Sequence, residues 1–179
     1  MQLTARRATA GAAPAIAHIY NQGIEDRLAT FETELRTAAG IAVTLAERGA
    51  RYPTMVVERE GNVVAWAGSS PYSSQPCYAG IAEFSVYTER TARGSGAGRA
   101  ALSGLIDACE QRGFWKLVSR VFIENAASRA LCAGLGFREV GVYVRHAQLD
   151  GVWHDCVIVE RLLAMPAGTG QSGGDLAAQ

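Results

Sequence analysis

The chain has 179 residues, which is enough for a single domain with a sizeable core around a central sheet. Its 17 basic and 17 acidic residues balance, so we expect neither a nucleic-acid surface, which would need excess positive charge, nor a polybasic contact with a membrane. The N-terminal MQLTARRATAG lacks the apolar core of a signal peptide, and no apolar run is long enough to span a bilayer, so we expect a cytoplasmic protein.

Hydrophobic patterning in the first half of the chain predicts helices at 12–23 and 40–48 and strands at 3–7, 52–58 and 63–68. The last two strands flank Glu60-Gly61-Asn62, a turn sequence typical of a β-hairpin. A polar stretch without periodicity follows at 71–76 and is predicted to be a loop.

The second half alternates strand and helix patterns, with helices expected at 97–112 and 125–134 and strands at 79–88, 116–123, 140–149 and 152–162. Adjacent strands joined by tight turns, together with strand–helix–strand units, indicate an α/β fold with a mixed sheet. We therefore expect one domain over residues 1–163. The segment 164–179 is rich in Gly, Ala and Ser and is predicted to be a tail outside the fold.

The cysteines and histidines show no metal-binding pattern. Four widely spaced cysteines, at positions 77, 109, 132 and 156, form no C-x-x-C pair and no cluster at zinc spacing. They are predicted to be free, half-buried thiols in a reducing compartment. His18 and His146 are interpreted as structural, and no metal site is expected.

The sharpest local feature is Arg93-Gly94-Ser95-Gly96-Ala97-Gly98-Arg99, between a predicted strand and the helix after it. Glycines let the backbone approach a ligand closely, and the free N–H groups of a helix N-terminus attract phosphate oxygens. Arg93 and Arg99 would add positive charge. The alternative is a flexible surface turn. A kinase-type P-loop is excluded because no Gly-Lys-Ser/Thr follows, and the late position of the turn disfavours a dinucleotide fold.

Several segments resemble the GNAT acyltransferase superfamily. Arg93-x-x-Gly96-x-Gly98 is similar to its pyrophosphate-binding signature, and the segment from Asn125 to Leu135-Gly136-Phe137 resembles the part that follows. Within the superfamily, the chain resembles the phosphinothricin N-acetyltransferase branch in four segments: Ile19-Tyr20-Asn21, Thr30-Phe31-Glu32-Thr33, Ala82-Glu83-Phe84-Ser85-Val86-Tyr87 and Gly151-x-Trp153-His154-Asp155. That branch includes enzymes that act on phosphinothricin, its arsenic analogue arsinothricin, and methionine sulfoximine or sulfone.

The resemblance implies a mixed central β-sheet flanked by helices, acetyl-coenzyme A as co-substrate, and a small glutamate-like amino acid acetylated on its α-amine. It also implies a detoxification or resistance enzyme, and a homodimer with active sites near the subunit interface. Backbone groups near Val86 and Thr88 would hold the pantetheine arm as a pseudo-strand, and the Val86 N–H would polarise the thioester carbonyl. The expected cofactor-binding residues are Val86, Tyr87, Thr88, Arg93, Gly94, Ser95, Gly96, Ala97, Gly98, Arg99, Asn125 and Ser128.

Glu83 is the first of two candidate catalytic residues. Strand alternation places it on one face with Ser85 and Tyr87, and places Phe84 and Val86 on the other. A partly buried carboxylate can remove a proton from a substrate ammonium, directly or through water. The resemblance implies this general-base role for Glu83. The alternative is a carboxylate on a solvated face or an edge strand.

His154 is the second candidate. A lone histidine in a strand is more often structural, but the resemblance around Trp153-His154-Asp155 suggests a second acid or base, or a substrate contact. Many members of the superfamily carry a tyrosine as the acid for the leaving thiolate where this chain has Cys132. The general acid is therefore left open between Cys132, which would be a poor one, and solvent.

The expected substrate-binding residues are Phe31, Ser73, Gln75, Tyr78, Glu83, Phe84 and Ser85. Phe31 is either a pocket aromatic or a core residue. Gln75 occupies a place where relatives often carry a basic residue that holds the acidic group of the substrate. Because glutamine cannot supply that charge, we expect weaker or altered recognition of anionic side chains.

Two other functions remain in competition. One is acetylation of a protein N-terminus or another amine, and the other is a non-catalytic sensor that binds acyl-coenzyme A. A carboxylate at Glu83 favours an enzyme, because a sensor has no need of a base at that place.

Overall fold

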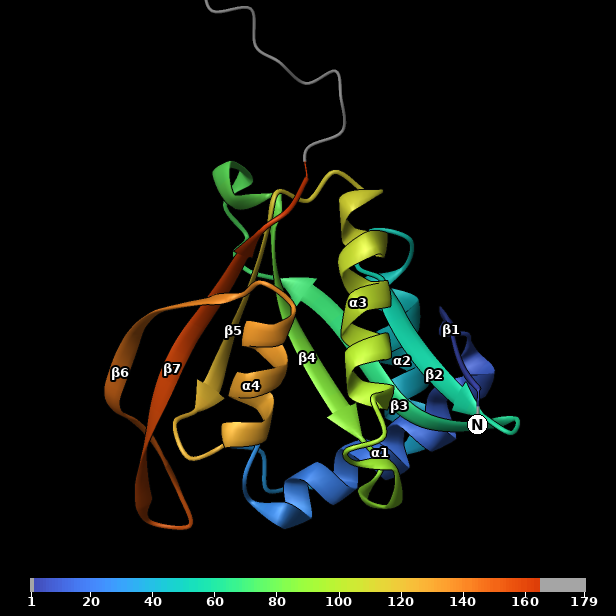
Figure 1. Ribbon diagram of the computed structural model, residues 1–179, viewed down its shortest axis with the longest axis horizontal. Helices are drawn as coiled ribbons and strands as arrows, with labels where there is room; N and C mark the ends of the chain where they lie inside the picture. The colour runs from blue at the N-terminus through green and yellow to red at the C-terminus, as the bar shows by residue number, and fades with distance from the viewer. Residues whose placement is uncertain (1, 165–179) are drawn as a thin grey trace, which may run out of the picture.

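The computed structural model describes residues 2–164, which form a seven-stranded sheet with helices on both faces (Figure 1). The strands are β1 Leu3–Arg7, β2 Thr54–Arg59, β3 Asn62–Pro71, β4 Ile81–Thr88, β5 Lys116–Phe122, β6 Arg138–Leu149 and β7 Val152–Leu162. The helices are α1 Ala13–Asp26, α2 Ala38–Arg48, α3 Ala97–Glu110 and α4 Ala126–Gly134, with short 3-10 turns at Ala10–Ala12, Pro76–Tyr78 and Arg90–Ala92. The predicted α/β fold with a mixed sheet is confirmed.

The strands lie in the order β1-β2-β3-β4-β5-β7-β6. Neighbouring strands are antiparallel except β4 and β5, which run parallel. β4 and β5 are paired only from Ile81↔Lys116 to Glu83↔Val118. Beyond that point the two strands diverge toward their C-terminal ends, as Figure 1 shows. This divergence opens a gap in the middle of the sheet.

The two faces of the sheet carry separate cores. In Figure 1, α3 and α4 lie in front of the sheet and α1 and α2 lie behind it. The front core contains the predicted apolar stripe of α3, made by Leu102, Leu105, Ile106 and Cys109. The rear core contains Ile16, Ile19, Ile41, Val56 and Trp66. Each fully buried Leu or Ile contributes roughly 1.5–3 kcal/mol, so both helical layers are held firmly to the sheet.

A few element ends differ from the predicted ones for local reasons. α1 continues past the predicted end at Gly23 to Asp26, because the chain turns left-handed only at Arg27, where φ is 57°. α2 begins before the predicted Gly40, because the Thr37 side chain caps it by accepting a hydrogen bond from Gly40 N. The cysteines are free as predicted, but Cys77 is exposed and the other three are buried rather than half-buried.

The end of the described chain lies beside α3. Ala164 donates its backbone N–H to Glu110 Oε1 at 3.2 Å, and the rest of the predicted tail lies outside the described residues. The domain boundary at 163 therefore stays a prediction. Across residues 2–164, no helix has both the length and the apolar run needed to cross a membrane.

Candidate active site

Two hydrogen bonds define which backbone groups of β4 face the gap. On the β3 side, Glu89 N donates to Val64 O at 2.9 Å. On the β5 side, Trp115 N donates to Gly80 O at 2.8 Å. Backbone groups alternate between the two edges of a strand. The odd-numbered residues of β4 therefore turn their N–H and C=O groups toward β3, and the even-numbered residues turn theirs toward β5.

The edge of β4 that faces the gap is formed by Phe84, Val86 and Thr88. Because the pairing with β5 ends at Glu83↔Val118, the backbone groups of Val86 and Thr88 and the C=O of Phe84 have no partner strand on that side within residues 2–164. An extended ligand arm laid in the gap could complete the ladder by hydrogen-bonding to them. Val86 and Thr88, which were predicted to hold a pantetheine arm, both lie on this edge.

The gap is continuous with a cavity of about 480 Å³. Its walls come from the diverging parts of β4 and β5, the end of α1, the glycine-rich turn before α3, and the first turns of α4. Of the predicted cofactor-binding residues, those that line it are Val86, Tyr87, Thr88, Arg93, Gly94, Gly96, Gly98, Arg99, Asn125 and Ser128. The tertiary structure thus brings together predicted residues from three separate segments, 86–88, 93–99 and 125–128.

The glycine-rich turn needs glycine for two different reasons. Gly94 and Gly96 have φ of 75° and 87°, a left-handed conformation that side chains disfavour, although a Cβ there would meet nothing within 4 Å. At Gly98 the reason is space, because a Cβ would lie 2.8 Å from Thr88 Oγ1. Gly96 is the N-cap of α3, so the unpaired N–H groups of the first helical turn lie at the cavity and suit a pyrophosphate.

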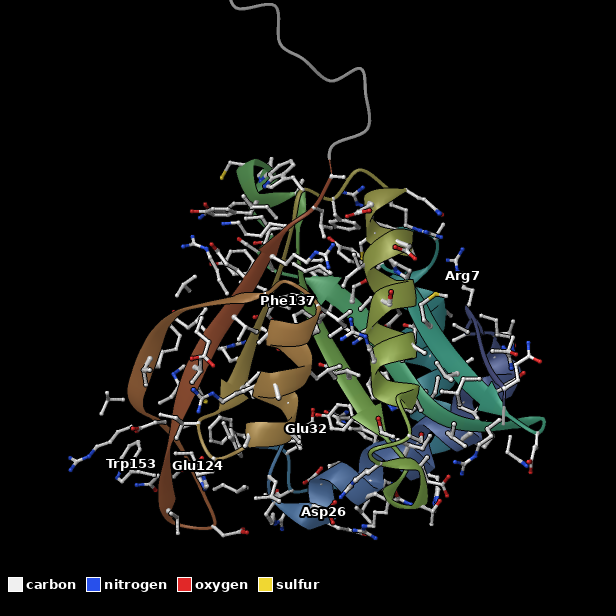
Figure 2. The ribbon with its side chains drawn as sticks, in the orientation of Figure 1. Arg7, Asp26, Glu32, Glu124, Phe137 and Trp153 are labelled. Atoms are coloured by element: carbon white, nitrogen blue, oxygen red, sulfur yellow. The ribbon has the colours of Figure 1, made fainter. Side chains whose placement is uncertain are left out.

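Arg93 is held by an acidic residue of α1. Arg93 Nη2 lies 2.5 Å from Asp26 Oδ2, and Arg90 Nη2 lies 2.7 Å from Asp26 Oδ1. Burial pushes the pKa of Asp26 upward, but hydrogen bonds from Arg90 and Arg93 outweigh it and lower the pKa. Asp26 therefore ties the end of α1 to the glycine-rich turn, at the foot of the molecule in Figure 2. The Arg93 side chain thus stabilises the turn, and Arg93 is also one of the residues that line the cavity.

Two other members of the turn lie off the cavity. Ser95 Oγ donates to Ala92 O at 2.6 Å, and Ala97 is buried at 1% exposure in the core under α3. Asn125 lines the cavity but also caps α4. Its Oδ1 accepts from Ser128 N, and its Nδ2 donates to Leu28 O, both at 3.0 Å.

Glu83 lies at the point where β4 and β5 part. Its carboxylate accepts a 2.7 Å bond from Arg120 Nη2, and its side chain is 31% exposed. Arg120 lines the cavity, and Glu83 is joined to it through that hydrogen bond. As predicted, Phe84 lies on the opposite face, where its ring packs 4.8 Å from Phe137. The Phe84 side chain therefore belongs to the core, and only its backbone faces the gap.

His154 lies in an aromatic cluster next to the cavity wall. Its ring stacks on Phe122 at 4.8 Å, and the Phe31 ring lies 6.2 Å away. His154 Nδ1 is buried, has no hydrogen-bond partner within residues 2–164, and lies 3.9 Å from Glu124 Oε2. Phe31 packs 4.7 Å from Phe122. Neither His154 nor Phe31 lines the cavity directly, but Phe122 joins both to it.

Three predicted substrate residues are not brought to the cavity. Ser73, Gln75 and Tyr78 lie in and before the short turn that precedes β4, at the end of that strand remote from the glycine-rich turn. The backbone N–H of Gln75 donates to Ser73 Oγ at 3.2 Å, and the centroid of the Tyr78 ring lies 5.6 Å from that of the Tyr72 ring. These residues contact one another rather than the gap.

Cys132 is unsuited to be a proton donor at the cavity. It is 1% exposed and belongs to the core between α4 and the sheet. Burial, followed by the charge of Glu139, raises the pKa of its thiol to about 11. Among residues 2–164, no group of three or more His, Cys, Asp or Glu side chains is placed to hold a metal ion.

The sequence analysis missed Arg120, Asp26 and Leu28. Arg120 had a usable signal, because it is a charge within the apolar strand Lys116–Phe122, as Glu83 is within β4. Asp26 lies beyond the predicted end of its helix, and Leu28 lies in a segment without periodicity. Their proximity to the cavity depends on how α1 packs against β4, which no local pattern reveals.

The chain matches the sequence profile of the acetyltransferase (GNAT) family over residues 17–137. The phosphinothricin N-acetyltransferase of Streptomyces viridochromogenes is 30% identical to it over 162 residues, which cover 90% of this chain and 88% of the relative.

Solved structures resemble the whole fold. A GNAT phosphinothricin acetyltransferase from Sinorhizobium meliloti, solved in complex with acetyl-coenzyme A, has a TM-score of 0.87 at 30% identity, covering 97% of this chain and 95% of that one. A ribosomal-protein-alanine N-acetyltransferase from Brucella melitensis has a TM-score of 0.86 at 34% identity, covering 89% of this chain and 99% of that one.

Proposed function

Because the chain belongs to the acetyltransferase (GNAT) family, we propose that it moves the acetyl group of acetyl-coenzyme A to the α-amine of a small, glutamate-like amino acid. The proposed substrates are of the phosphinothricin, arsinothricin or methionine sulfoximine type. Similarity to a phosphinothricin N-acetyltransferase over 90% of the chain supports this substrate class. In this role the protein is a detoxification or resistance enzyme.

One observation carries the proposal. A carboxylate, Glu83, lies at the point where β4 and β5 part, and the backbone edge of Phe84, Val86 and Thr88 begins directly after it. A base and a row of backbone donors and acceptors thus meet at one place. This arrangement suits direct transfer to an amine, and it needs no cysteine as a covalent relay.

The residues present fit acetyl-coenzyme A. The first turn of α3, after Gly94 and Gly96, would hold the pyrophosphate, and the open edge of β4 would hold the pantetheine arm. The bound co-substrate supplies an activated acetyl thioester. Val86 N–H faces the gap, where it would donate a hydrogen bond to the thioester carbonyl oxygen.

Glu83 would accept the proton of the substrate ammonium, directly or through one water, so that the amine attacks as a neutral nucleophile. Arg120 fixes the position of that carboxylate through the 2.7 Å contact. Because Cys132 is buried with a raised thiol pKa of about 11, we assign the proton for the departing thiolate to solvent. His154, whose ring stacks on the cavity residue Phe122, is proposed as a second acid or base, or as a substrate contact.

The proposal is tested by acetyl-coenzyme A-dependent thiol release with phosphinothricin, arsinothricin, methionine sulfoximine, methionine sulfone, ordinary amino acids and a peptide. Glu83→Ala is measured alongside. We expect turnover of one small amino acid and a strong loss in the variant. Binding of acetyl-coenzyme A without turnover of any acceptor would instead favour the sensor, or an amine outside the panel.

A second candidate is acetylation of a protein N-terminus. The similarity to a ribosomal-protein-alanine N-acetyltransferase, at 34% identity, favours it. The peptide in the panel separates the two candidates. If an alanine-terminated peptide is acetylated with a higher kcat/KM than every free amino acid, the amino-acid proposal is wrong.

We also propose a homodimer that works in the cytoplasm. Exposed large hydrophobic residues gather on the β6–β7 ribbon at Val140, Val142, Tyr143, Val144, Val152 and Trp153. Trp153 points outward there in Figure 2. Such a patch favours a second copy of the chain as its partner. Light scattering of the wild type and Val144→Asp tests this, and a wild-type monomer at micromolar concentration would refute it.

The proposed location in the cytoplasm is supported by the four free cysteines, which favour a reducing compartment.

A further inference from the structure

α2 ends with a half-buried arginine that lies over the same sheet face as Glu83. A Cβ built on Gly68 would lie 3.0 Å from Arg48 Nη1 and 3.1 Å from Thr54 Oγ1. Gly68 pairs with Thr54 on β2 and with Ser85 on β4. The Arg48 guanidinium therefore lies above the row Thr54–Gly68–Ser85, in space that a larger residue at position 68 would fill.

The Arg48 guanidinium has no ion-pair or hydrogen-bond partner within residues 2–164. Burial lowers its pKa, and the weaker effect of Tyr20 opposes this. A half-buried cation without a counter-ion is unfavourable unless a ligand pairs with it. Thr54 Oγ1, beside the guanidinium, is buried and also lacks a hydrogen-bond partner among the described residues. The guanidinium, which is only half-buried, is therefore suited to an anionic ligand.

The same face is open to a ligand. Ser85 is exposed although β4 is an inner strand of the sheet, so α1 and α2 leave this part uncovered. Ser70 pairs with Glu83, and Gly68 pairs with Ser85. With neighbouring strands about 4.8 Å apart, the guanidinium over Gly68 and the carboxylate of Glu83 lie on the order of 10 Å apart. A molecule of the length of glutamate can span that distance.

We propose that Arg48 is a substrate-binding residue that pairs with an acid group of the acceptor amino acid while Glu83 faces its amine. This inference rests on the proposed function. A guanidinium binds a carboxylate, phosphinate or arsinate through two parallel N–H···O bonds, which fixes the orientation of the acceptor. Gly68 leaves the space in which the guanidinium lies. Arg48, Gly68, Glu83, Ser85 and Arg120 are called the acceptor face below.

Arg48→Met tests the pairing by steady-state kinetics. The acceptors are methionine sulfone, its α-carboxamide, and phosphinothricin, which carries a second acid group. Losing a charge-assisted pair of hydrogen bonds should lower kcat/KM for the paired acid roughly 10- to 100-fold. The carboxamide should be acetylated equally well by variant and wild type. Arg59→Met, at the other end of β2, removes the same charge away from the acceptor face and should change nothing.

The pattern of losses identifies the acid group. If the preference for methionine sulfone over its carboxamide disappears in Arg48→Met, the α-carboxylate is paired with Arg48. If only the preference for phosphinothricin over methionine sulfone disappears, the side-chain acid is paired. If both preferences in Arg48→Met match those of the wild type, the inference about Arg48 is wrong, but the proposed acetyltransferase function is not contradicted.

A binding measurement separates this inference from the proposed function. The Nε–Hε NMR resonance of Arg48 is assigned through its loss in Arg48→Lys, and the wild type is then titrated with methionine sulfone and phosphinothricin without acetyl-coenzyme A. We expect that resonance to shift with at least one acceptor. A shift without acetyl transfer would refute the proposed function and leave the anion site in place, whereas no shift would overturn the inference.

Discussion

The gap between β4 and β5 and the acceptor face meet at Glu83, but they are built in different ways. The backbone groups of β4 and the glycines of the short turn that line the gap are neighbours in the sequence, whereas β5, α1 and α4 complete its walls. The acceptor face uses side chains from α2, β4 and β5, and the space left by a glycine of β3, which are far apart in the sequence. A site built from backbone groups should therefore tolerate most side-chain substitutions, but it should be disturbed when one of its glycines is replaced. A site built from side chains depends on each one.

The largest expected effect is at Glu83, where both regions meet. Glu83→Gln keeps the size and an oxygen that can accept from Arg120, but it removes the base. Because general-base catalysis contributes about 10²–10⁴-fold, kcat should fall by that range while KM for acetyl-coenzyme A stays nearly constant. Stopped-flow or coupled thiol assays measure both constants. Glu47→Gln, on the exposed side of α2, serves as the control, and an equal loss there would contradict the assignment.

The next largest effect is expected when a single backbone N–H of β4 is removed without changing the side chain. Replacing residue 86 by its α-hydroxy acid converts the amide to an ester, which removes the N–H that faces the gap, keeps the side chain, and weakens the Ser85 carbonyl that faces β3. We expect kcat to fall roughly 10²–10³-fold, the usual loss for one donor to a developing oxyanion. The same change at residue 85 removes an N–H that faces β3, so it should lower thermal stability and spare kcat. Equal kinetic losses at both positions would refute the role of Val86.

A smaller effect is expected in the glycine-rich turn. Gly96→Ala places a side chain at a φ of 87°, which costs about 1–2 kcal/mol and tilts the first turn of α3. KM for acetyl-coenzyme A should rise roughly tenfold, equivalent to about 1.4 kcal/mol. Gly141→Ala is the matched control, because a Cβ there meets nothing within 4 Å. A KM unchanged in Gly96→Ala would show that the turn does not need this conformation.

The smallest effect is expected at Asp26, whose ion pairs with Arg90 and Arg93 are partly exposed. Asp26→Asn should lower the free energy of unfolding by roughly 0.2–1 kcal/mol. Because the pKa of Asp26 is lowered in the folded protein, its contribution is present above the ordinary carboxyl range and is lost as the pH falls below about 4. Urea unfolding at pH 7 and pH 3 checks the sign. If the difference in the free energy of unfolding between the wild type and Asp26→Asn were larger at pH 3 than at pH 7, the assigned sign would be wrong.

Much of the fold was predictable because it follows from local periodicity. The strand at Leu3–Arg7 has the predicted bounds, and the apolar stripe of α3 is buried as expected. The glycine-rich turn before α3, which we propose binds the cofactor, was predictable for a related reason. Its proposed role depends on local backbone conformation and on a helix N-terminus, both of which are encoded within a few residues.

What the sequence alone determined is therefore the mixed sheet, the glycine-rich turn and the alternation that places Glu83 opposite Phe84. Only the tertiary structure decided that β4 and β5 part at Glu83, that Arg120 holds its carboxylate, and that Arg48 lies over Gly68. It also decided that Gln75 and Tyr78 lie away from the cavity. The physical reason is that periodicity specifies which face of an element is buried, whereas contacts between distant side chains depend on how whole elements pack.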